Sequence, residues 1–146
     1  MSRDVQMQRV VMLDSIAVVA TRSRYPEFTE HRKMAVAGKF FGPEEIARRH
    51  PAMTSDLVRS VGGFTIDRSR ARSRVVGARG MSSRNSCIAN VVIDGMSLGS
   101  MDPDAISVDD VNPRDIGAIE IYREDEMAPP EYGGGRCGTI VIWTKR

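Results

Sequence analysis

The clearest pattern of apolar and polar positions lies in the last third of the chain. Residues 119–123 read I-E-I-Y-R and alternate apolar with polar side chains, which is the period of two that is typical of a β-strand. Residues 140–143 form a continuous apolar run rich in β-branched side chains, which suits a strand covered on both faces. The glycine-rich stretch 133–138 separates the two, so we expect two strands joined through a tight turn.

Shorter strand patterns lie upstream. Apolar runs predict strands at residues 64–66, 75–80 and 89–93, and the Asp94-Gly95 pair that ends the last of these is a strong turn signal. Residues 10–20 are apolar and rich in β-branched side chains, which favours one strand or two short ones over a helix.

Helical patterns fill the region between these strands. Residues 25–39 start with a proline near the first turn and place acids before bases, as the helix dipole favours. Residues 43–49 have a similar start, with proline followed by two glutamates. A third helix should be capped by Thr54 or Ser55 and end at Gly62-Gly63. Together, these predicted strands and helices indicate an α+β domain with about four or five short strands, two or three short helices and long loops.

Composition and charge narrow the class of protein. The 146 residues suggest one domain, and with 5% aromatic residues the core must be filled by Val, Ile, Leu and Met. A net charge of +2 is too mild to indicate nucleic-acid binding. No apolar run approaches the ~18–20 residues of a membrane-spanning helix. Asp14 and Ser15 interrupt the apolar N-terminal stretch, so it is not a convincing signal peptide.

Two cysteines are the first candidates for chemistry. Cys87 and Cys137 fit no zinc pattern, because His31 and His50 lie far away in sequence. Each cysteine stands just before an expected strand. If those strands are neighbours that run the same way, a disulfide is feasible at a Cα separation of about 5.5–6 Å. Two free thiols in a reducing compartment are the alternative.

Other candidate sites have simpler interpretations. The run Gly133–Arg136 lacks the spacing of a phosphate cradle and predicts a turn. The basic run Asp67–Arg74 has no aromatic residues for stacking on nucleic acid and predicts a solvated loop. The aspartates of residues 94–110 lack calcium-loop spacing. His31 and His50 are expected on helix surfaces, and nothing pairs a nucleophile with a base. We therefore predict no metal, no cofactor and no enzymatic activity.

Six motifs follow one another along residues 42–145. They are G-P-E-E-I (Gly42–Ile46), T-S-D-L-V-R-S-V-G-G-F (Thr54–Phe64), a strand that ends in Arg79-Gly80, V-V-I-D-G (Val91–Gly95), N-P-R-D-I-G-A-I-E-I-Y-R (Asn112–Arg123) and E-Y-G-G-G-R-C-G-T-I-V-I-W-T-K (Glu131–Lys145). In this order, the set resembles the plug domain of TonB-dependent outer-membrane receptors. The residues that carry the resemblance are Arg79, Gly80, Asp94, Gly95, Ile119, Glu120, Arg123, Tyr132, Gly133 and Gly138.

The chain departs from the family's pattern at two places. The family usually has a proline-glycine pair where this chain has Gly62-Gly63. The family also commonly follows the arginine at Arg123 with Gly-Pro, whereas here the acidic run Glu124–Glu126 follows.

The resemblance implies a small mixed sheet and a non-enzymatic role in binding or gating for outer-membrane uptake. It places residues 42–146 in the plug-like domain and residues 1–41 in a preceding strand and helix arm. The implied location is the cell outer membrane or the periplasm. The implied partners are an outer-membrane β-barrel or a TonB-type energy-coupling protein, with no nucleic acid and no direct membrane span. Residues 13–22 resemble the region where a coupling peptide adds to its partner as a strand, and a core strand is the alternative.

Chain length leaves several interpretations open. A receptor barrel of ~22 strands does not fit into 146 residues. The chain could be a free-standing periplasmic module, a partner of a separately encoded barrel or a truncated product. It could also be a stand-alone soluble module that binds ligands or proteins, and a basic-loop nucleic-acid binder is a third hypothesis.

Overall fold

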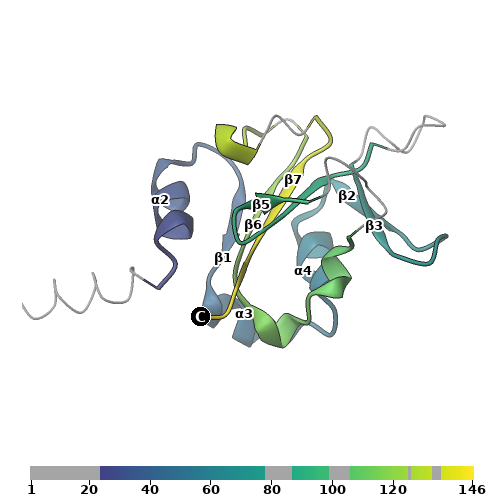
Figure 1. Ribbon diagram of the computed structural model, residues 1–146, viewed down its shortest axis with the longest axis horizontal. Coiled ribbons are helices and arrows are strands. Elements are labelled where there is room, and N and C mark those ends of the chain that lie inside the picture. The colour runs from purple at the N-terminus through teal and green to yellow at the C-terminus, as the bar shows by residue number, and fades with distance from the viewer. Residues whose placement is uncertain (1–23, 78–86, 99–105, 125, 133–135) are drawn as a thin grey trace, which may run out of the picture.

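A five-stranded mixed sheet forms the centre of the computed structural model, which describes residues 24–77, 87–98, 106–124, 126–132 and 136–146 (Figure 1). The strands lie side by side in the order β1 (Lys39–Phe41), β6 (Ile116–Tyr122), β7 (Thr139–Thr144), β4 (Asn90–Ile93) and β5 (Met96–Ser97). Strands β6 and β7 come from the alternating segment and the apolar run of the last third. All seven residues of β6 are buried, because both faces of the sheet are covered.

The register fixes which side chains share a face. Strand β6 pairs with β7 in antiparallel fashion, with Ile119 opposite Ile142. Strand β7 pairs with β4 in parallel, with Thr139 opposite Asn90. Because successive side chains of a strand point to opposite faces, Ile119 and Ile121 face one side and Glu120 faces the other.

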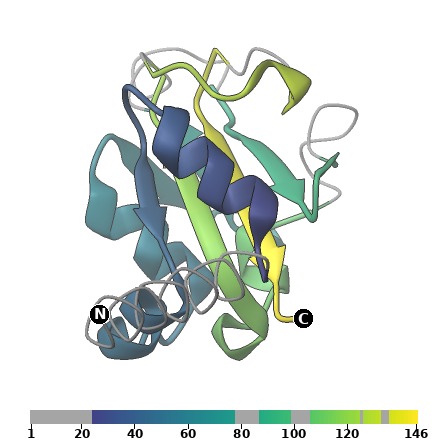
Figure 2. The same cartoon turned by 90° about the vertical axis from the view of Figure 1, so that its left-hand side faces the viewer.

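Helices cover the two faces of this sheet unequally. Helices α3 (Pro43–Arg49) and α4 (Thr54–Val61) lie on one face, and α2 (Pro26–Met34) crosses the other (Figure 2). A two-stranded antiparallel sheet, β2 (Phe64–Asp67) and β3 (Arg74–Gly77), follows α4. The short 3₁₀ turns are η2 (Val108–Asp110), η3 (Pro113–Asp115) and η4 (Pro130–Tyr132).

The buried apolar residues form one cluster on each face of the sheet. On the α3–α4 face, isoleucines of β6 and β7 pack with Leu57 and Val58 of α4, which are at most 1% exposed. On the α2 face, Ala118, Val141 and Trp143 pack with aromatic residues from outside the sheet, which are Tyr25, Phe28 and Tyr132. The domain therefore buries both sides of its central strands.

The α+β class and the small mixed sheet are confirmed, two local predictions were wrong, and a third falls on residues that are not described. The helix expected to reach residue 39 ends at Met34, and the unpredicted edge strand β1 follows it. The third helix has Met53 as its N-cap, so Thr54 is its first helical residue rather than its cap. Residues 10–20, where a strand was expected, lie outside the described residues.

Candidate functional site

The most unusual group in the described structure is the carboxylate of Glu120, at the centre of β6. Its side chain is 0% exposed. The Tyr122 hydroxyl donates to it at 2.5 Å and the Trp143 indole nitrogen at 2.6 Å. His31 Nδ1 lies 3.0 Å from both carboxylate oxygens. A buried carboxylate needs several such donors, because burial removes its water.

Strand geometry explains how these donors meet. Glu120 and Tyr122 are two residues apart on one strand, so their side chains project on the same face. Trp143 pairs with Ala118 across the β6–β7 ladder, which places the indole beside Glu120. His31 comes from α2, which lies over this face of the sheet.

His31 also contacts a second carboxylate. Its Nε2 lies 2.9 Å from Glu131, which is next to Tyr132 in η4. The Tyr132 ring meets the imidazole edge-on at 5.7 Å. The expectation that His31 lies on a helix surface was wrong, since its side chain is 14% exposed and lies between two carboxylates. The helical spacing from Phe28 to His31 is the sequence signal that places both on one face.

The ionisation of this cluster follows from its contacts. Burial lowers the pKa of His31, but hydrogen bonds and charge from Glu120 and Glu131 outweigh it, so the net pKa is raised. Burial, followed by the Glu120 contact, raises the pKa of Tyr122 far above its ordinary value, so this phenol stays a neutral donor. Burial also raises the pKa of Tyr132. The cluster can therefore bind and release a proton at His31.

Cys87 and Cys137 form the disulfide that the strand order made feasible, with Cα atoms 5.2 Å apart. Cys87 precedes β4 and Cys137 precedes β7, and these strands are parallel neighbours. The Cys87 carbonyl also accepts from the Gly77 amide at 2.8 Å. The bridge therefore ties the starts of β4 and β7 together, at the point where the end of β3 is hydrogen-bonded to Cys87.

The remaining motif residues are distributed over the fold. Asp94 takes a positive φ of 49° in the turn between β4 and β5, and its carboxylate accepts from the Thr144 amide at 2.9 Å. Arg123 Nε lies 3.2 Å from Glu126 in the acidic run. Ile119 belongs to the core. Arg79, Gly80 and Gly133 lie outside the described residues.

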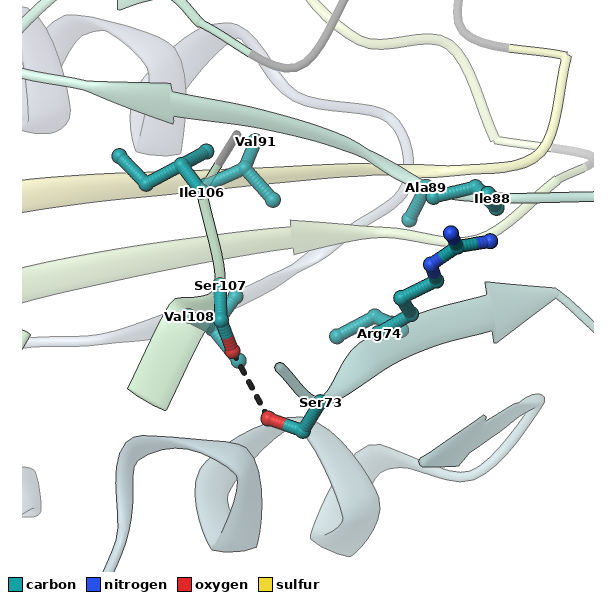
Figure 3. Close-up of a pocket in the computed structure, with 9 residues that line it drawn as sticks. Ser73, Arg74, Ile88, Ala89, Val91, Ile106, Ser107 and Val108 are labelled. Carbon is teal, nitrogen blue, oxygen red and sulfur yellow. Dashed lines mark hydrogen bonds between the residues drawn. The ribbon is translucent and has the colours of Figure 1, made fainter. Parts of the chain in front are cut away.

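A small cavity lies between β3, β4 and the segment before η2 (Figure 3). Its volume of about 10 Å³ is close to that of one water molecule. Ser73 and Ser107 meet at its edge with their hydroxyl oxygens 2.7 Å apart. A small-molecule site needs roughly 300 Å³ or more, so this cavity is not one. Within the described ranges, no group of three or more His, Cys, Asp or Glu residues could hold a metal ion.

Comparison with known families identifies the chain. The profile of the TonB-dependent receptor plug domain matches residues 31–140, which is most of the sequence. The chain belongs to the TonB-dependent receptor plug domain family. The plug domain also resembles a solved mutant of the ferric enterobactin receptor PfeA from Pseudomonas aeruginosa. That likeness has a TM-score of 0.57 and 23% identity over 82% of this chain and 18% of the receptor chain.

A second structure of PfeA, in complex with BCV-L6, gives a similar result. Its TM-score is 0.55 at 23% identity, over 78% of this chain and 18% of that chain. The plug domain thus spans about one fifth of the receptors it resembles, and the likeness supports the fold. A search of curated proteins gave no match. No helix within the described residues is long and apolar enough to cross a membrane.

Proposed function

We propose that this plug domain has a non-enzymatic binding or gating role in uptake across the outer membrane. The family match over residues 31–140 carries the proposal, because plug domains of this family are components of transport receptors. The α+β fold supports it through the likeness to PfeA.

The proposed location is the periplasmic side of the outer membrane. The Cys87–Cys137 bridge supports an oxidising compartment, where such bonds form and persist. The proposed partners are an outer-membrane β-barrel and a TonB-type energy-coupling protein. Residues 13–22 are the proposed coupling segment, and they lie outside the described residues.

Cell fractionation combined with affinity purification tests this proposal. The tagged chain is purified from detergent-solubilised outer membranes, and its thiols are alkylated before reduction. We expect a barrel protein to co-purify in about equal amounts, with both cysteines protected from alkylation. The control is Ile119→Asp, which puts a charge at a core position with 0% exposure and should abolish the association by unfolding the domain. A monomer in the cytosol with two alkylated thiols contradicts the proposal.

A stand-alone binding module is the second candidate. The feature that favours it is the self-contained core, since α2 covers the sheet face that α3 and α4 leave open. A domain that buries both faces with its own residues can fold without a surrounding pore. A periplasmic monomer with an intact disulfide and no barrel partner favours this candidate over the first.

A further inference from the structure

Helix α2 is held on the sheet by few contacts. It is nine residues long, and isolated helices shorter than ~12–15 residues are marginal in water. Its N-cap, Tyr25, makes no side-chain capping bond. The apolar contacts that attach it come from Tyr25 and Phe28, which are 6% and 5% exposed. At its far end, Met34 is 78% exposed.

Besides the apolar contacts of Tyr25 and Phe28, α2 is attached to the sheet by a polar and ionisable side chain, that of His31. His31 inserts between Glu120 of β6 and Glu131 of η4, at 3.0 and 2.9 Å. The other two donors to Glu120, which are Tyr122 and Trp143, are neutral. In the described part of the chain, His31 therefore brings the positive charge that meets the buried carboxylate. This charge is present only when the imidazole is protonated.

We propose that α2 is a pH-sensitive cover of the sheet, which His31 locks onto Glu120 and Glu131 when protonated and which loosens as the pH rises. The lock joins three segments that are far apart in sequence, namely α2, β6 and the η4 region. When α2 loosens, water reaches the face of the sheet that carries Trp143. Helices α3 and α4, on the other face, stay in place.

The charged and titratable groups around His31 determine the direction of the change. Glu120 and Tyr122 face it from β6, and Glu131 and Tyr132 face it from the η4 region. The flanking charged residues on α2 itself are Glu27, Glu30, Arg32 and Lys33. The tyrosines stay neutral because their pKa values are raised.

The net effect of these groups is a raised pKa of His31 in the folded protein. A raised folded-state pKa means that the lock is fully present below the unfolded value of about 6.5 and is lost as the pH rises through the folded value. The loosening is therefore expected as the pH rises above about 6.5, the unfolded value, and not below it.

Trp143 makes the motion measurable, because it is the single tryptophan of the chain and is 2% exposed beneath α2. The experiment measures quenching of its fluorescence by acrylamide from pH 5.5 to 9 in the full, oxidised chain. We expect weak quenching at low pH and stronger quenching above the folded pKa of His31. Amide-exchange protection of α2, relative to that of β7, should fall by about tenfold for each unit by which that pKa exceeds the unfolded value.

Two variants and one direct titration decide the outcome. His31→Gln keeps a polar side chain without a charge, so its quenching should stay at the high-pH level throughout. His50→Asn changes the other histidine, which is exposed at the end of α3, and should keep the wild-type transition. Should His31→Gln not fold, histidine NMR of the wild type still tests the proposal. A His31 pKa at or below about 6.5, or protection of α2 that does not change with pH, overturns it.

Discussion

Glu120 shows how one buried charge organises its surroundings. Its carboxylate accepts from Tyr122 and Trp143 and lies against His31, so three neighbours depend on it. We expect Glu120→Gln to lower the free energy of unfolding by about 1–3 kcal/mol at pH 6, because an amide replaces one acceptor oxygen with a donor. Urea unfolding measures this. The control is Glu44→Gln, which changes an exposed glutamate in the first turn of α3, with an expected change within about 0.5 kcal/mol. Equal stability of the two variants contradicts the prediction.

Gly138, just before β7, occupies a position that disfavours any side chain for two reasons. Its φ of +95° is unfavourable for any side chain, and an added Cβ would lie 2.6 Å from the Phe64 ring. Gly95 has a similar φ of +86° with nothing within 4 Å, so it shows the backbone effect alone. We expect Gly95→Ala to cost about 1–2 kcal/mol and Gly138→Ala to cost about 1–3 kcal/mol more. Chemical denaturation of both variants measures the difference, and equal losses would show that Phe64 yields without cost.

The first turn of α4 depends on a carboxylate from another element. Asp109 of η2 accepts from the Ser55 amide at 2.8 Å and from the Ser73 hydroxyl at 2.8 Å. It satisfies an unpaired helix amide and adds a negative charge near the positive end of the helix. We expect Asp109→Ala to destabilise the domain by about 1.5–3 kcal/mol. Thermal unfolding at neutral pH tests this against Asp115→Ala, an exposed aspartate of η3 that should change little.

At the scale of elements, the sequence predicted those with strong local signals. Proline followed by two glutamates placed α3, and the Asp94-Gly95 pair placed the turn into β5. The chain after Met34 was mispredicted because K-F-F in β1 is too short to show a period. Its extended conformation comes from pairing with β6 and from packing of Phe41 in the core. Such long-range contacts leave no local pattern.

The same limit explains what was missed in the candidate site. Nothing around Glu120 in the sequence shows that its strand is covered on both faces, since I-E-I-Y-R also suits a half-exposed strand. The cover is α2, which lies about 90 residues earlier in the chain, and His31 meets Glu120 only through tertiary packing. The resemblance to plug domains implied a small mixed sheet, and the family match and the fold then confirmed that class of fold.

The disulfide acts on the molecule as a whole, because it closes a loop across a sequence separation of 50 residues. In the chain-entropy model, a loop of this size contributes about 4 kcal/mol, and removal of a native disulfide typically costs 2–5 kcal/mol. We expect Cys87→Ser/Cys137→Ser to lower the free energy of unfolding by that amount in urea. The reduced wild type should match the variant, because both lose the same constraint on the unfolded chain.

A reducing agent provides the internal control for this prediction. It should destabilise the wild type and leave the double serine variant unchanged. The parallel pairing of β4 with β7 begins directly after the two cysteines, with Asn90 opposite Thr139. Loss of the bridge should therefore increase amide exchange first at Asn90 and its neighbours, with smaller changes at the antiparallel β6–β7 pair. Exchange that rises equally in all strands would mean that the bridge stabilises the domain through the unfolded chain alone and does not hold this edge of the native sheet.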